Sequence, residues 1–148
     1  MAETKYGKYI ITEPRPERIT QELIASGEPP ASPDVEASVI YLDDTLLPGG
    51  LYTDGVWQWK PSPPSLRPVH THDFDEVLAF IGTDPKNPRD LCGEVELWLG
   101  DERHVLTKSC VVFVPKGLKH CPLRFVRVDR PIFWFSTGPA TGGYQRLE

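Results

Sequence analysis

The sequence predicts an all-β domain made of many short strands. It holds 16 prolines and 12 glycines spread along the chain, and between them lie short runs of β-branched, aromatic and leucine residues. Its length of 148 residues suits one domain with one hydrophobic core. Short apolar strands separated by turn residues are typical of a β-sandwich or barrel.

The expected strands follow one another closely along the chain. They are residues 6–12, 37–42, 51–60, 66–72, 76–81, 94–99, 103–107, 110–114, 120–128 and 131–136. One short helix is expected at 16–26, where Ile19, Leu23 and Ile24 form an apolar stripe that Gly27 can end. The proline-rich stretches 28–34 and 61–64 are expected to be extended connections.

Charge and composition exclude several classes of function. The chain carries 16 Lys and Arg against 21 Asp and Glu, a net charge of -5, so no nucleic-acid partner is expected. No apolar run is long enough for a membrane span, and the first residues lack the apolar core of a secretory signal. We therefore expect a cytoplasmic location. With three cysteines and no close-spaced pair, we expect reduced thiols.

The histidines carry the clearest chemical signal. His70 and His72 are alternate residues, so on a strand both imidazoles face the same way. Glu76 follows four residues later, and a tight turn at 115–119 can bring in His120 from a neighbouring strand. Imidazole nitrogens with one carboxylate oxygen suit a divalent transition metal, with Fe, Mn, Ni, Cu and Zn all acceptable.

These residues stand in the order of two known motifs. The first motif is matched by His70, His72, Glu76 and the closing Gly82, and the second by Pro115, Gly117 and His120. The sequence therefore resembles the cupin superfamily over residues 64–124. The resemblance implies a single cupin jelly-roll barrel whose interior binds a metal through His70, His72, Glu76 and His120.

The resemblance also suggests how the chain is organised. Residues 37–138 are expected to form the barrel, 1–36 an N-terminal extension with strands that packs on it, and 139–148 a C-terminal tail. Four positions depart from the family pattern. Pro64 and Ser109 replace the opening glycines of the two motifs, Gly82 comes one residue early, and Arg124 stands where the second motif usually ends with Asn.

Arg124 is the candidate catalytic residue. It has the parity of His120 on the expected strand, so its guanidinium points into the barrel unless a bulge changes the phase. There it would bind a substrate carboxylate, phosphate or enolate. His104, in contrast, follows a charged run and is expected at the surface of a hairpin.

Two further features concern the outside of the barrel. The connection 83–90 is longer than a hairpin requires and is a candidate lid over the barrel mouth. Phe133, Trp134 and Phe135 form a strand that is apolar on both faces, which needs cover on its outer side. We therefore expect a homodimer.

The reaction is less determined than the metal site. Cupins with this ligand set include dioxygenases, decarboxylases, isomerases, lyases and hydrolases, so the resemblance implies a metal-dependent enzyme rather than one reaction. We expect a small phenolic, keto or carboxylic substrate chelated at the metal. Among the possible enzymes, the first expectation is an iron-dependent oxygenase. A non-redox decarboxylase, isomerase or lyase using Mn, Ni or Zn is the alternative, and a ligand-binding cupin without catalysis comes third.

Overall fold

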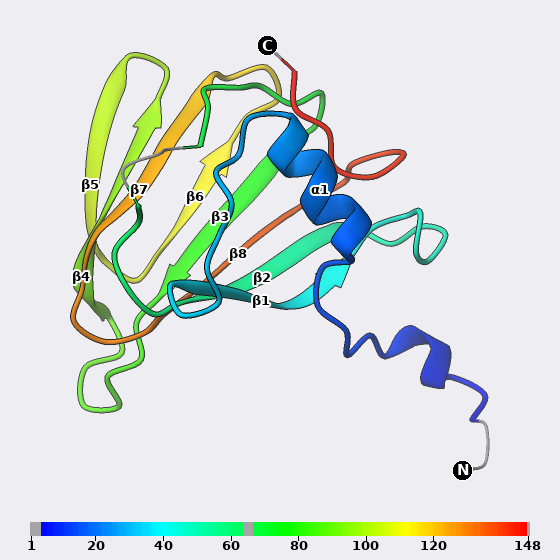
Figure 1. The fold of residues 1–148 in the computed structure, drawn as a ribbon, viewed down its shortest axis with the longest axis horizontal. Coiled ribbons are helices and arrows are strands. Elements are labelled where there is room, and N and C mark those ends of the chain that lie inside the picture. Colours follow the sequence, from blue (N-terminus) through cyan, green and yellow to red (C-terminus); the bar gives the residue numbers. More distant parts are fainter. Residues whose placement is uncertain (1–3, 64–66, 148) are drawn as a thin grey trace.

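The computed structural model describes residues 4–63 and 67–147, and these form two antiparallel sheets. The strands are β1 (Glu36–Leu42), β2 (Tyr52–Gln58), β3 (Glu76–Ile81), β4 (Asp90–Leu99), β5 (Glu102–Lys108), β6 (Cys110–Val114), β7 (His120–Val128) and β8 (Ile132–Gly138). One sheet has the order β1-β2-β8-β3-β6 and the other β5-β4-β7 (Figure 1). This is the all-β, jelly-roll architecture expected from the sequence.

The strands alternate between buried and more exposed positions. Along β8 buried residues alternate with half-buried ones, and β4 shows the same pattern from Leu91 to Trp98. Because successive side chains on a strand point to opposite faces, each sheet has one face turned to the interior. The apolar residues of these inner faces form the core.

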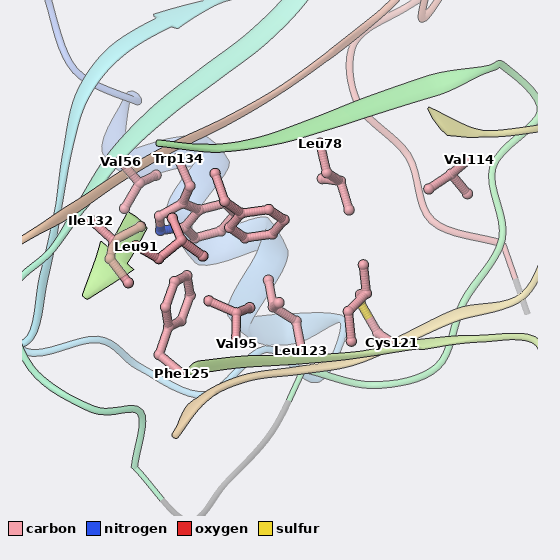
Figure 2. Close-up of a cluster of buried hydrophobic side chains, with 12 residues drawn as sticks. Val56, Leu78, Leu91, Val95, Val114, Cys121, Leu123, Phe125, Ile132 and Trp134 are labelled. Carbon is pink, nitrogen blue, oxygen red and sulfur yellow. The ribbon is translucent and has the colours of Figure 1, made fainter. Parts of the chain in front are cut away.

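The main core lies between the two sheets. The larger sheet contributes Phe80 and Trp134, whose rings stack with centroids 6.1 Å apart. The smaller sheet contributes Phe125 and Leu97, neither of which is exposed at all. Figure 2 shows Phe125 and Trp134 within this cluster, on opposite sides of the interior.

A second apolar cluster attaches the helix to one end of the barrel. Helix α1 (Glu17–Ala25) confirms the helix expected at 16–26. Its Ile19 packs with Tyr41, Tyr52 and Phe74, and Phe74 lies two residues before the start of β3. Figure 1 shows α1 and the labelled strands. No helix in the described ranges has the length and hydropathy needed to cross a membrane.

The strand expected at 6–12 is wrong. The segment contains a short 3-10 helix, η1 (Gly7–Tyr9), in which the amide of Tyr9 donates to the carbonyl of Tyr6. The amide of Gly7 also donates to the Thr4 hydroxyl, 3.1 Å away. Tyr6 and Tyr9 are exposed and no sheet edge pairs with them in the described chain, so local hydrogen bonds replace a ladder.

The strand expected at 66–72 is also absent as a regular element. Residue 66 lies outside the described residues, and the remainder makes isolated bridges, His70 with His120 and Thr71 with Leu147. Pro68 has no amide hydrogen to donate to a ladder. The segment nevertheless keeps the two histidines anchored against β7 and the C-terminal residues.

Candidate metal centre

Three histidines converge inside the barrel. His70 and His72 lie on the segment before β3, and His120 is the first residue of β7. One ligand nitrogen from each lies within 4.8 Å of the other two. The residues are 5%, 3% and 1% exposed respectively, so the group is shielded from solvent.

A turn brings His120 to this position. The amide of Leu118 donates to the carbonyl of Pro115 (3.1 Å), and Gly117 adopts a φ of 85°. The amide of Gly117 also donates to the carbonyl of His72, 3.0 Å away. The tight turn expected here is therefore present, and it is tied directly to another histidine of the group.

Backbone carbonyls orient all three imidazole rings. The Nδ1 atoms of His70, His72 and His120 lie 2.7, 2.6 and 3.0 Å from the carbonyl oxygens of Pro68, Gln145 and Leu118. Because a carbonyl can only accept, each Nδ1 carries a hydrogen, so in the neutral ring each Nε2 keeps a lone pair. Holding the ring in this tautomer is what carbonyl partners of metal-binding histidines do.

Glu76, the first residue of β3, lies beside two of these histidines. Its Oε1 lies 3.5 Å from Nε2 of His72 and 3.3 Å from Nε2 of His120, and the residue is 2% exposed. These approaches form no hydrogen bond, so both Nε2 atoms are buried without a hydrogen-bond partner among the described residues. Buried polar atoms are normally paired, and a cation coordinated by both nitrogens and the carboxylate satisfies all of them.

The electrostatics of the site favour metal binding at neutral pH. Burial lowers the pKa of His70 to about 3, and Arg146, His120 and His72 act in the same direction. Burial acts to raise the pKa of Glu76, and His120 and His72, when they are protonated, lower it below its usual range through hydrogen bonds and charge. His70 is therefore neutral and Glu76 anionic, as a divalent cation requires of its ligands.

The expected inward orientation of Arg124 is wrong. Between β4 and β7 the register runs from Leu97 opposite Leu123 to Leu99 opposite His120, so β7 holds one extra residue. This bulge reverses the alternation, and Arg124 is exposed, opposite Glu96. It lies on the outer face of the smaller sheet, away from the histidines.

Of the expectations for His104 and for connection 83–90, the first is confirmed and the second is wrong. His104 is exposed on β5 beside Glu102, 3.2 Å away, as expected. Connection 83–90 follows the end of β3 whereas Glu76 begins that strand, so the connection lies away from the site (Figure 1). It is therefore not a lid over the metal centre.

Pro64 and Ser109, which replace the opening glycines of the two motifs, have different outcomes. Pro64 lies outside the described residues. Ser109 does not adopt a positive φ; its hydroxyl instead donates to the carbonyl of Pro88 (2.6 Å) and accepts from the amide of Gly82 (2.9 Å). The turn is thus made without glycine, and the serine side chain ties connection 83–90 to β3.

Sequence reasoning missed a set of charged residues in the cavity beside the histidines. The cavity walls include three arginines and two acidic residues, namely Arg15, Arg67, Arg146, Glu28 and Asp54. They come from the N-terminal extension, β2, the segment before β3 and the C-terminal segment. Residues this distant in the chain gave no common motif.

One of these missed residues, Arg146, and the neighbouring Tyr144, which also lines the cavity, had a local signal. Tyr144 and Arg146 are alternate residues, so in an extended segment their side chains leave on one side. The bridge between Thr71 and Leu147 and the hydrogen bond from His72 to Gln145 fix this segment to the site. The expected C-terminal tail therefore forms part of the site.

Comparisons with known proteins find likeness in three-dimensional structure alone. No protein-family model matches the chain, and no curated protein matches it. An RmlC-like cupin from Shewanella frigidimarina is similar, with 19% identity, a TM-score of 0.41, and coverage of 72% of this chain and 77% of that chain. KdgF from Halomonas sp. has 13% identity and a TM-score of 0.46, covering 77% of this chain and 86% of that chain.

Oxalate oxidase in complex with the substrate analogue glycolate is also similar. The identity is 16% and the TM-score 0.48, with 78% of this chain covered. The chain spans 56% of that enzyme's length. At these identities and TM-scores the similarities carry no argument about a reaction.

Proposed function

We propose that the protein is a metal-dependent enzyme that acts on a small organic substrate at the centre formed by His70, His72, Glu76 and His120. One observation carries the proposal. Every Nδ1 of the three rings donates to a backbone carbonyl, and the buried Nε2 atoms of His72 and His120 have no hydrogen-bond partner in the described chain. Leaving such atoms unpaired costs about 1–3 kcal/mol each, and metal coordination removes that cost.

The donor set restricts the metal to a group of ions. Three imidazole nitrogens and one carboxylate oxygen suit a divalent transition metal and leave open positions on a five- or six-coordinate ion. We propose iron, and the same donors accept Mn, Ni, Zn or Cu. When bound, the ion supplies Lewis-acid or redox chemistry to a chelated substrate.

The protein's own residues shape the space for that substrate. Leu78, Leu123 and Trp134 provide apolar walls next to His70 and His120. These walls exclude water, which strengthens electrostatic interactions within the site. Trp134, 7% exposed, is part of this wall, and a flat or partly apolar phenolic, keto or carboxylic molecule suits it.

For the reaction we propose an iron-dependent oxygenase. A non-redox decarboxylase, isomerase or lyase is the alternative, and the hydroxyl of Tyr144 favours it. This hydroxyl lies 3.4 Å from Nε2 of His70, where a phenol can hold or pass a proton during non-redox chemistry.

Substrate conversion with and without dioxygen distinguishes these reactions. Protein reconstituted with Fe(II) is assayed against a panel of phenols and 2-oxo acids, with oxygen uptake and substrate loss measured together. We expect uptake that matches substrate loss and that disappears in His120→Ala. Equal conversion under anaerobic conditions identifies the non-redox alternative. The absence of conversion in either atmosphere by fully metal-loaded protein contradicts an enzymatic function on these substrates.

We also propose a cytoplasmic protein without a nucleic-acid partner. The three cysteines, Cys92, Cys110 and Cys121, form no disulfide, which suits a reducing compartment. The net charge of -5 gives no general attraction to a phosphate backbone.

A homodimer through the outer face of the five-stranded sheet is a further part of the proposal. On β6, Val111 and Phe113 are 70% and 58% exposed. They lie beside the buried Ala79 and the half-buried Val77 of β3, and the exposed Ile81 of the same strand lies beside Phe133 of β8. Contiguous apolar surface of this kind is typical of protein–protein contacts.

A charge on this face tests the dimer. We expect sedimentation equilibrium at micromolar concentration to give about twice the chain mass of 16.7 kDa for the unmodified protein and one chain mass for Phe113→Glu. The control is Val105→Glu, which places the same charge at an exposed position of β5 in the other sheet. A monomeric unmodified protein, or a Phe113→Glu variant that still dimerises, contradicts this interface.

A further inference from the structure

The cavity beside the histidines contains the buried guanidinium group of Arg146, which has an unused hydrogen-bond donor. The side chain of Arg146 is 10% exposed. Its Nε donates to the hydroxyl of Tyr144 (3.3 Å) and one terminal nitrogen donates to Glu28 (2.7 Å). The other terminal nitrogen, NH1, is buried and has no partner in the described ranges.

We propose that Arg146 and Tyr144 form the carboxylate-binding subsite of the metal centre, so that the substrate is a small organic monoanion. The inference rests on the proposed function, because it requires a metal ion at the histidines. It assigns to Arg146 the anchoring role that the sequence predicted for Arg124. The argument has three steps: position, donor direction and charge.

Arg146 is close enough to the histidines to contact a ligand of the metal. The Tyr144 hydroxyl lies 3.4 Å from Nε2 of His70 and 3.3 Å from Nε of Arg146. One phenol oxygen therefore separates the guanidinium from a metal-binding nitrogen. A molecule bound to the ion needs only a few atoms to reach both side chains, which limits the substrate to a small acid.

Metal binding directs the phenol hydrogen toward such a ligand. Nε of Arg146 carries a hydrogen and donates to the Tyr144 oxygen, so the phenol hydrogen points away from Arg146. Without metal it is directed at the lone pair on Nε2 of His70. Once that lone pair coordinates a cation, the phenol needs another acceptor. A carboxylate oxygen beside the metal accepts from Tyr144 and from NH1 of Arg146 together.

The charges of the cavity leave one positive charge unbalanced. Arg15 pairs with Asp54 (2.8 Å), Arg67 with Glu28 (2.9 Å) and with Glu36 (3.1 Å), and Arg146 with Glu28 (2.7 Å). Three guanidinium groups thus face three carboxylates. A divalent cation on Glu76 adds one net positive charge, and buried charges require compensation. One monoanionic carboxylate supplies it.

Glu28 is a positioning residue in this arrangement. Its carboxylate accepts from Arg146 through one oxygen and lies against Arg67 through the other. The residue is 9% exposed, and burial of all three partners keeps the pairs unscreened by solvent. Glu28 therefore fixes the Arg146 guanidinium with NH1 left over for a ligand.

Calorimetric binding of matched charged and neutral probes tests the subsite. The metal-loaded protein is titrated with acetate, lactate and pyruvate and with the corresponding uncharged amides, with metal content measured in the same samples. For at least one pair we expect the acid to bind about 10-fold or more tightly than its amide, as a charge-assisted hydrogen bond provides. Arg146→Met should remove this preference and retain one metal ion per chain.

Two further variants keep the test decisive. Arg124→Met removes an exposed arginine outside the cavity and should keep the full preference for the acids. Tyr144→Phe retains the ring that stacks on Tyr52, with centroids 4.5 Å apart, and should reduce the preference for the acids. It provides the test if Arg146→Met does not fold. Equal binding of acids and amides by the unmodified protein, or an unchanged preference in the folded Arg146→Met or Tyr144→Phe variant, overturns the subsite. Unmodified protein that binds no metal instead overturns the proposed function.

Discussion

Replacing His72 with alanine will remove stoichiometric metal from the protein. His72 supplies one of three converging nitrogens, and its Nδ1 is already committed to the carbonyl of Gln145, 2.6 Å away. Loss of a group that merely orients a ligand costs 10- to 100-fold in metal affinity, so loss of the ligand itself should cost about 100-fold or more. Elemental analysis of protein purified without chelators or a nickel column measures the change.

The thermal stability should change in parallel. Metal at about 1,000 times its Kd stabilises a folded protein by about 4 kcal/mol, so added metal should raise the Tm of the unmodified protein by roughly 8–16 °C. His72→Ala should show little of this increase. His104→Ala is the control, because His104 is exposed on β5, beside Glu102 and outside the histidine group. Full metal content in His72→Ala, or metal loss in His104→Ala, contradicts the assignment.

Replacing Gly82 with alanine will destabilise the fold by about 3 kcal/mol or more. A Cβ at this position would lie 2.0 Å from the carbonyl oxygen of Asp90 and 3.2 Å from Cα of Leu91. Both are backbone atoms where β4 begins, so relief requires a shift of the strand itself. Overpacking costs roughly 1–3 kcal/mol and occasionally more, and a clash with backbone belongs at the upper end. Thermal unfolding should show a Tm lower by roughly 6–12 °C.

Gly49→Ala separates this clash from the general cost of replacing a glycine. Gly49 has a φ of 83° and no atom within 4 Å of an added Cβ, so only backbone strain of about 1–2 kcal/mol is expected. Its Tm should fall by only a few degrees. If Gly82→Ala is as stable as the unmodified protein, the close approach between the end of β3 and the start of β4 is wrong.

The sequence was sufficient to pick out the residues that the structure brings together at the candidate metal centre, because their spacing is local. His70, His72 and Glu76 lie within seven residues, and the turn before His120 has its own proline and glycine. The alternation of a strand places such residues on one side, and a short turn redirects the chain toward them. The helix at α1 was predictable for the same reason, since its apolar stripe and its closing Gly27, with a φ of 106°, are local features.

Arg124 and Arg146 show what local patterns do not contain. The orientation of Arg124 depended on whether β7 alternates regularly, and one extra residue opposite β4 reverses it. A bulge of this kind is set by the pairing of two strands. Arg146 enters the cavity because the C-terminal segment pairs with Thr71 and because Glu28, 118 positions away, binds its guanidinium. Only the assembled tertiary structure brings these groups together.

An anomalous difference map from crystals of the metal-loaded protein, recorded at the absorption edge of its ion, tests the central claim most directly. The structure predicts one strong peak at about 2.0–2.2 Å from Nε2 of His70, His72 and His120 and from a carboxylate oxygen of Glu76. A peak that contacts Nδ1 atoms, that lies among other residues, or that is missing from this cluster in protein with full metal content contradicts the account.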